Sequence, residues 1–523
     1  METLKELVDL IHRNKGNAID VIGYQQDGLV SKVNHFYQKI AAGELPSDEA
    51  AANYFFGTDA SDIAYRKLKS KLKSRLINTV FFINVKQANY TEQERAYVTC
   101  WKEWAAAKIL FGRGAAKLGA DLAHRILKQS QFFEFTELSV SIIKALRTYY
   151  ATRRLDLRKF EKFNILYREF ARQLEAENLA EEYYLVLVAH YIHSRASKPE
   201  LSRQAEEFYL DLEPLLTQFN SFRLHRYYYM IRVVSHMTRS DYRGTIAVCD
   251  EALSLLRTRA FYSPGSESNF LYQKLVCHTQ LKEYREGRQV AEESLNLEVP
   301  GSYNWFKNRE LGLILAMHTR NYQEAHSIFR QAVEHPDFRI LDPISVENWK
   351  IYEAYLHYLQ LIGRVVPEGA TQPSSFRIGR FLNEVPVFSR DKRGMNIPIL
   401  VIQILFSITQ KQYDKAVQRI ETIQKYCSRY LRHDDTFRSN CFIRMLLQIP
   451  KSKFHRSGVI RRAEPFRKQL EEVPLEVANQ GHDIEIIPYE DLWEIALESL
   501  GTRFFQGTAR RGNTEAHGER RRE

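Results

Sequence analysis

The sequence predicts an all-α fold, an α-solenoid in which pairs of helices repeat along the chain. First, four segments share a pattern that starts at a tyrosine, Tyr242, Tyr284, Tyr322 and Tyr413, and the first three are 42 and 38 residues apart. Second, an apolar helical segment and a short polar turn precede each of these tyrosines. Third, a chain of 523 residues is long for one compact core, whereas a repeat array grows without a single centre.

Small residues recur on one face of the helix predicted after each tyrosine. Three positions after the tyrosines come Thr245, Gly287, Ala325 and Ala416, and ten positions after them come Ala252, Ser294, Ala332 and Ile423. Such offsets lie on one side of a helix, where small side chains let a neighbouring helix approach closely. Each unit is therefore predicted to be a helix, a turn and a second helix, whose apolar stripes are buried by stacking. The alternative is a non-repetitive helical bundle.

Two of the repeated segments carry a resemblance to a known family. "DYRGTIAVCDEAL" (241–253) and "QYDKAVQRIETIQ" (412–424) resemble the second helix of the tetratricopeptide repeat (TPR), which reads Tyr-x-x-Ala-Ile-x-x-Tyr-x-x-Ala-Leu. The spacings here exceed the standard repeat of about 34 residues, so the units are TPR-like. The resemblance implies a right-handed α-solenoid whose first helices line a concave face that binds a protein or peptide.

Composition shifts divide the chain into four predicted regions. Residues 1–88 form a helical N-terminal region, in which Ser47 is expected to cap a helix, and residues 89–450 form the TPR-like array with an irregular insertion at about 364–396. Residues 451–506 form a basic connector, a short strand in "DIEII" (483–487) and a capping helix after Pro488. Residues 507–523 are expected to be a disordered basic tail.

The strongest charge run, "YRKLKSKLKSRL", predicts a basic helix. Tyr65, Leu68, Leu72, Leu76 and Val80 form its apolar stripe, and the cations Arg66, Lys67, Lys69, Lys71, Lys73 and Arg75 cover the rest. In one interpretation this helix lies against the phosphates of DNA or RNA without reading bases. In the other it is a solvated outer face. A second basic cluster, with Arg461 and Arg462, is either a flexible connector or a further anion contact.

A candidate groove comes from the segment "RLHRYYYMIRVV" (223–234), a predicted first helix. Because the resemblance implies that first helices line the concave face, its Arg and Tyr side chains are candidates for holding a peptide carboxylate or stacking on a flat ligand. The candidates are Arg223, Arg226, Tyr228, Tyr229 and Arg232. The alternative is that they pack between helices.

The remaining features narrow the class of protein. The formal net charge of +11 favours anionic partners. The five cysteines contain no C-x-x-C pair, which predicts neither a disulfide framework nor a zinc site and favours a reducing cytoplasm. His190 and His193 are spaced for a metal but have no evident third ligand, and no catalytic or dinucleotide-binding motif occurs, so we expect no enzyme, metal or cofactor. The longest apolar run, 397–408, is too short for a membrane span, so no membrane partner is expected.

These observations lead to two functional hypotheses. The first is a non-catalytic scaffold or adaptor that binds a protein or peptide on the concave face of the array. The alternative is a nucleic-acid-associated regulator, in which the basic helix contacts DNA or RNA and the array senses a partner. The sequence leaves the oligomeric state open.

Overall fold

The computed structural model describes residues 1–13, 31–81, 85, 90–193, 198–261, 263–366, 396–430, 437–475 and 485–501. Within these ranges the fold is all-helical and contains no strand, which confirms the predicted all-α class; His455 and Gly501 form an isolated parallel bridge. The chain divides into two compact units. Unit 1 is Met1–Glu175 with Arg259–Ser263, and unit 2 is Ala176–Thr258 with Pro264–Glu523. The division falls inside helix α8.

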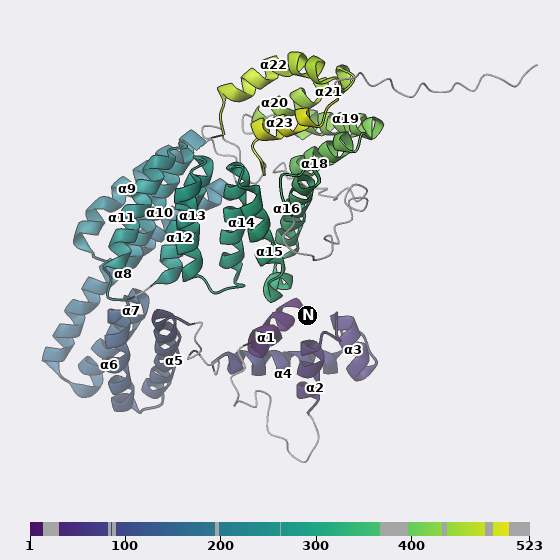
Figure 1. The fold of residues 1–523 in the computed structure, drawn as a ribbon. Helices are drawn as coiled ribbons and strands as arrows, with labels where there is room; N and C mark the ends of the chain where they lie inside the picture. The colour runs from purple at the N-terminus through teal and green to yellow at the C-terminus, as the bar shows by residue number, and fades with distance from the viewer. Residues whose placement is uncertain are drawn as a thin grey trace, which may run out of the picture. The chain divides into compact units, whose positions relative to one another are not determined.

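Unit 1 contains two helical cores (Figure 1). Its helices are α1 (Glu2–Arg13), α2 (Lys32–Ala41), α3 (Asp48–Phe56), α4 (Ile63–Val80), α5 (Glu92–Gly112), α6 (Ala116–Phe132), α7 (Thr136–Tyr149), the π-helical turn η1 (Tyr150–Arg154) and the first part of α8 (Leu157–His193). Helices α1 to α4 enclose one core, which includes Leu4, Phe36 and Leu72. The other includes Trp104 of α5 and Ile126 of α6.

Helix α3 begins as the sequence predicts. The Ser47 hydroxyl accepts a hydrogen bond from the Ala50 N–H at 3.1 Å, and Asp48 and Glu49 occupy the first turn. The helix ends at Gly57, whose φ of 67° is left-handed and therefore suits glycine. Local sequence thus fixes both ends of this helix.

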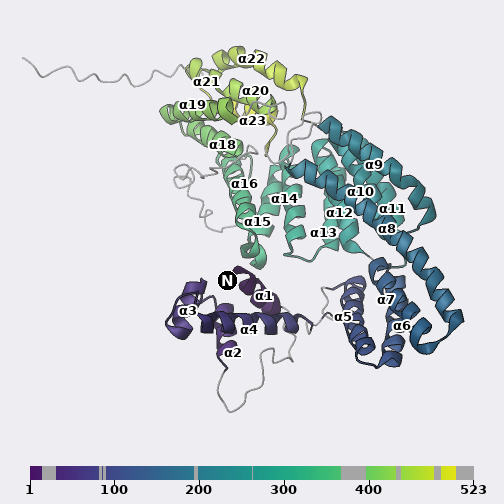
Figure 2. The ribbon, with the colours of Figure 1, turned by 180° about the vertical axis from the view of Figure 1, so that it is seen from behind.

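In unit 2, consecutive helices pack as neighbouring pairs: α10 with α11, α12 with α13, α14 with α15, and α18 with α19 (Figures 1 and 2). The helices are α9 (Lys198–Gln218), α10 (Phe222–Thr238), α11 (Tyr242–Arg257), α12 (Pro264–Gln280), α13 (Tyr284–Leu297), α14 (Tyr303–His318), α15 (Tyr322–Val333), the 3₁₀ turn η2 (Pro336–Ile340), α16 (Pro343–Leu361), α18 (Asn396–Thr409), α19 (Tyr413–Tyr430), α20 (Phe437–Leu446), α21 (Gln448–Lys451), α22 (Arg456–Glu472) and α23 (Tyr489–Glu498). This consecutive pairing is consistent with an α-solenoid.

One turn recurs before all four repeated tyrosines. In each case the N–H of the residue before the tyrosine bonds to the carbonyl five residues earlier: Asp241 to His236 at 3.0 Å, Glu283 to His278 at 2.9 Å, Asn321 to Ala316 at 2.8 Å and Gln412 to Ser407 at 2.8 Å. The residue two before the tyrosine is left-handed, with φ of 58° at Ser240, 56° at Lys282, 60° at Arg320 and 58° at Lys411. This is the Schellman way of ending a helix, so the repeated sequence encodes a repeated turn.

The small face of the second helices is buried. Thr245, Ala325 and Ala416 are fully buried, and so are Ala252, Ser294, Ala332 and Ile423 at the second position. At Gly287 a Cβ atom would lie 2.6 Å from Cδ2 of Leu315 in α14. Neighbouring helices therefore approach at these positions as the pattern predicts.

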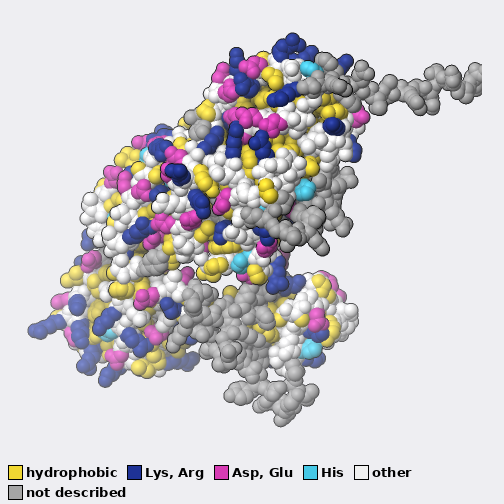
Figure 3. Space-filling model, viewed as in Figure 1, with side chains coloured by type: hydrophobic (Ala, Val, Ile, Leu, Met, Phe, Trp, Pro, Cys, Tyr) yellow, Lys and Arg dark blue, Asp and Glu magenta, His cyan; other side chains and the backbone are white. Residues whose placement is uncertain are grey.

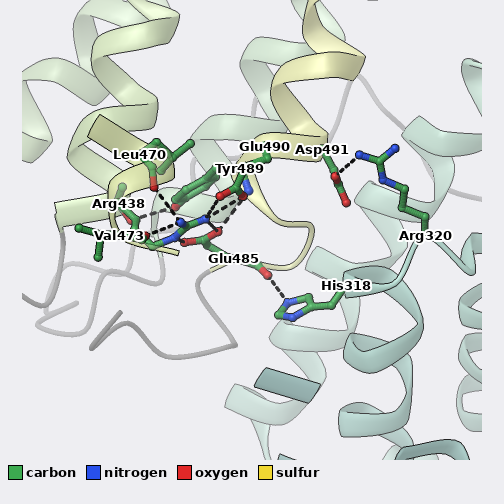
Figure 4. Close-up of polar contacts among 10 residues, drawn as sticks. His318, Arg320, Arg438, Leu470, Val473, Glu485, Tyr489, Glu490 and Asp491 are labelled. Atoms are coloured by element: carbon green, nitrogen blue, oxygen red, sulfur yellow. Dashed lines mark hydrogen bonds and ion pairs between the residues drawn. The ribbon is translucent and has the colours of Figure 1, made fainter. Parts of the chain in front are cut away.

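Residues 485–501 hold several helices of unit 2 together. Arg438 of α20 is fully buried, and its guanidinium donates to Glu485 at 2.7 Å, to Glu490 at 2.8 Å and to the Val473 carbonyl at 2.7 Å (Figure 4). The Glu485 carbonyl lies 2.6 Å from Nε2 of His318 at the end of α14. Further bonds join this segment to the turn after α14, to the chain just after α16 and to the end of α18: Arg320 to Asp491, Arg364 to Glu498 and Thr409 to Ser499.

The predicted capping helix is present as α23, but the strand predicted within 483–487 is wrong at Glu485, Ile486 and Ile487. These residues are buried, and the Glu485 carboxylate accepts the Tyr489 N–H at 3.1 Å, so the segment leads into α23 instead of pairing with a strand. Most of the predicted insertion, 367–395, and the tail lie outside the described residues. Among the helices that are described, none is long and apolar enough to cross a membrane.

Candidate functional site

The predicted basic helix is α4, and its two faces differ as the sequence indicates. The Asp62 carboxylate accepts the Tyr65 N–H at 2.8 Å and caps the helix. Tyr65, Leu68, Leu72 and Leu76 are buried in the core of α1 to α4, and Val80 is half-buried. The apolar stripe therefore docks α4 and leaves the opposite face to solvent.

The six cations of α4 have different surroundings. Lys69 is half-buried and pairs with Asp48 of α3 at 2.7 Å, and Arg75 is half-buried. The four exposed cations are Arg66, Lys67, Lys71 and Lys73. They form no ion pair with any described residue, and α4 itself contains no Asp or Glu. The solvent face of α4 is thus positive without internal compensation.

Lys69 belongs to the fold of unit 1. Burial raises the pKa of the Asp48 carboxyl, but hydrogen bonds from Lys69 and Tyr65 outweigh burial and hold that pKa well below its ordinary value. Asp48 is therefore a stable anion that ties α3 to α4. Lys69 is held by this contact, so the exposed charge of α4 comes from Arg66, Lys67, Lys71 and Lys73.

On α10, the candidate groove residues cross-link helices of unit 2. Arg223 pairs with Glu181 of α8 at 2.5 Å, and Arg232 pairs with Glu251 of α11 at 2.6 Å. The buried Tyr228 donates its hydroxyl to Glu213 of α9 at 3.2 Å. The guanidinium of Arg232 also lies 5.7 Å from the ring centres of Tyr228 and Tyr229. Two of the three candidate arginines, Arg223 and Arg232, are therefore already paired with carboxylates of this chain.

Arg226 differs from its neighbours on α10. Its guanidinium lies 4.8 Å from the ring centre of Tyr227 and has no carboxylate partner in the described part of the chain. The sequence could not reveal the glutamates that neutralise Arg223 and Arg232, because they lie on helices whose register against α10 is set only by packing. The spacing of residues along one helix carries no information about partners on another helix.

The second basic cluster lies on α22. Arg461 and Arg462 are exposed and form no ion pair with a described residue, whereas Arg467 pairs with Glu464 at 3.2 Å and with Glu471 at 3.3 Å. Val459, Ala463 and Leu470 bury the opposite side of the helix. This segment, predicted as a connector, is a docked helix with an exposed basic pair. It belongs to unit 2, whereas α4 belongs to unit 1.

No group of three His, Cys, Asp or Glu residues that could hold a metal occurs among the described side chains. His190 is exposed at the end of α8, and the side chain of His193 lies outside the described set. No protein-family model matches this chain, and neither a curated protein nor a solved structure matches it.

Proposed function

We propose that this chain is a non-catalytic binding protein whose helix α4 contacts the phosphates of a nucleic acid. The observation that supports it is the exposed face of α4, where Arg66, Lys67, Lys71 and Lys73 have no carboxylate partner among the described residues. A helix docked by its apolar stripe presents these charges from a fixed support, which lowers the ordering cost of binding. The sequence offered nucleic-acid association as the alternative to a protein-binding scaffold, and we propose it as the leading function because of this exposed basic face.

The proposed contact acts through charge. The 18 residues of α4 span about 27 Å, so its cations can follow several consecutive phosphates. Neutralising phosphates releases condensed counterions, which makes affinity strongly dependent on salt. Lys and Arg contacts to phosphates position a protein without reading sequence, so α4 is proposed to bind with little sequence preference.

Protein or peptide binding by unit 2 is the second candidate function. We propose that its hairpins are TPR-like repeats in a right-handed solenoid and that Arg226 pairs with a partner carboxylate. The observation that favours this is the guanidinium of Arg226, which lies beside the Tyr227 ring and has no carboxylate partner among the described residues. Cys100, Cys249, Cys277 and Cys441 are buried free thiols, which supports the cytoplasm as the proposed location.

The nucleic-acid proposal is tested by fluorescence anisotropy with labelled duplex DNA and with RNA, at about 50 and 200 mM salt. We expect binding whose logarithmic salt slope is about −3 to −4, as four phosphate contacts predict. The variant Arg66→Gln/Lys67→Gln/Lys71→Gln/Lys73→Gln should lose most of this slope and bind far more weakly at low salt.

A matched control removes the same charge from arginines that already have carboxylate partners: Arg125→Gln/Arg203→Gln/Arg288→Gln/Arg330→Gln. This control should bind nearly as well as the native chain. The proposal fails if neither nucleic acid binds at low salt, or if both quadruple variants weaken binding equally. Equal weakening would mean that net charge, and not α4, governs the interaction.

A further inference from the structure

The turn between α7 and α8 in unit 1 projects two leucines into solvent. Every side chain from Ala151 to Lys159 is exposed except Asp156, which is half-exposed. Leu155 is 78% exposed and Leu157 is 68% exposed, among the highest values for large apolar residues in the described chain. We call residues Ala151–Lys159 the Leu155 turn. With eight of these nine side chains exposed, the turn is a projecting apex and offers no groove for a peptide.

The backbone of this apex is unusual. The chain leaves α7 through the π-helical turn η1, and Leu155 then adopts φ 53° and ψ 42°, with its N–H bonded to the Tyr150 carbonyl. A left-handed conformation is unfavourable for leucine and ordinary for glycine or asparagine. Such strain and π-helical turns occur often at functional sites. The fold thus carries a bulky apolar residue at a position where a smaller one would fit better.

Positive charge surrounds the two leucines. Between Tyr150 and Lys162 the chain has five cations, Arg153, Arg154, Arg158, Lys159 and Lys162, against the two carboxylates of Asp156 and Glu161. Lys159 lies 3.9 Å from Asp156. The other four cations form no ion pair with any residue that the structure describes. Figure 3 shows Lys and Arg side chains gathered on the surface around α6 and the start of α8.

We propose that the Leu155 turn docks this protein on an anionic lipid surface. Leu155 and Leu157 enter the headgroup region, while Arg153, Arg154 and Arg158 stay at the level of the lipid phosphates. Guanidinium groups pair well with phosphate oxygens, and long cationic side chains can reach them while their stems lie along apolar surface. A projecting apolar tip with flanking cations fits a lipid interface, since a folded acidic partner would need a complementary concave surface.

This proposal changes one expectation from the sequence. The absence of a long apolar run led us to expect no membrane partner. Peripheral docking needs no spanning helix, because a few exposed apolar side chains and several cations suffice for reversible binding. The proposal is independent of α4, because the exposed cations of α4 lie on a helix that packs in the α1–α4 core, whereas the Leu155 turn follows α7, which belongs to the other core of unit 1.

The test is sedimentation of the full-length protein with vesicles of phosphatidylcholine alone or mixed with phosphatidylserine. We expect binding only to the acidic vesicles. Leu155→Asn keeps the charge and suits the left-handed backbone, so it should preserve or raise the melting temperature while weakening vesicle binding about tenfold. Arg153→Gln/Arg154→Gln/Arg158→Gln should weaken binding by about fivefold per arginine.

Three controls make the result specific to this turn. Leu210→Ser removes an exposed leucine of α9 and should leave binding unchanged. In the background of the quadruple α4 variant, Leu155→Asn should still weaken vesicle binding. The single variant Leu155→Asn should bind DNA with the same affinity as the native chain. The proposal is overturned if acidic vesicles do not bind, if neutral vesicles bind equally, or if Leu155→Asn binds like the native chain. Leu155-dependent binding of polyglutamate without vesicle binding would assign the turn to an acidic protein segment instead.

Discussion

The same substitution, glycine to alanine, is expected to stabilise one helix of unit 2 and to fail to stabilise its neighbour. Gly287 lies in α13, where an added Cβ would lie 2.6 Å from Cδ2 of Leu315 and 3.1 Å from Cβ of His278. Gly312 lies in α14, where the nearest atom to an added Cβ is Cδ1 of Ile328 at 3.9 Å. Only the first glycine is needed for a close approach between helices.

The magnitude follows from two opposing terms. Alanine is more favourable than glycine inside a helix by about 1 kcal/mol, so Gly312→Ala should raise the free energy of unfolding by about that amount. At Gly287 the same gain is opposed by overpacking against buried side chains, which costs about 1–3 kcal/mol. Gly287→Ala should therefore be neutral or destabilising by up to about 2 kcal/mol.

Hydrogen exchange followed by mass spectrometry is the suitable assay, because a helical array opens locally and need not unfold in a single step. Exchange in the peptides of α13 and α14 should slow in Gly312→Ala and stay unchanged or become faster in Gly287→Ala. If Gly287→Ala protects α13 as strongly as Gly312→Ala protects α14, the helices are not in the close contact described here.

Two further predictions concern buried or paired charges. Arg438→Met should destabilise the region from α20 to α23 by about 3–5 kcal/mol in urea unfolding, because it leaves Glu485 buried without its partner. The double variant Arg438→Met/Glu485→Met should recover part of that loss. A single variant as stable as the native chain would contradict this prediction. The contribution of the ionised Asp48 carboxylate to the free energy of unfolding should be fully present above its ordinary pKa of 3.8. It should decline as the pH falls below that value, because the pKa of this carboxyl is lowered in the folded state. The melting temperature of Asp48→Asn, measured as a function of pH, should lack this decline. An identical dependence of the melting temperature on pH in Asp48→Asn and in the native chain would refute the prediction.

The hairpins could be predicted because their information is local. The turn before Tyr242 or Tyr284 and the small residues after it lie within one short stretch, so a repeated pattern reports a repeated geometry. The bonds of residues 485–501 to α14, to α18 and to the residues that follow α14 and α16 could not be predicted in the same way. His318 meets the Glu485 carbonyl across 167 positions, and no periodic pattern marks such a pair.

The candidate sites also contain contacts that sequence spacing could not predict. The stripe of α4 predicted which side is buried, and the exposed Lys67, Lys71 and Lys73 follow from it. The pairing of Lys69 with Asp48 and of Arg232 with Glu251 depends on how two helices are aligned, which sequence spacing within one helix does not contain. The exposure of Leu155 was also hidden, since a leucine after a helical run ordinarily predicts burial.

The bonds made by residues 485–501 have a consequence for biosynthesis. Helices α14, α16, α18 and α20 leave the ribosome before the segment that joins them, so Arg438 emerges without the carboxylates that later surround it. Until Glu485 and Glu490 follow, the hairpins of this region can stack on one another only through their immediate neighbours. Their final assembly therefore waits for the last part of unit 2 to be translated.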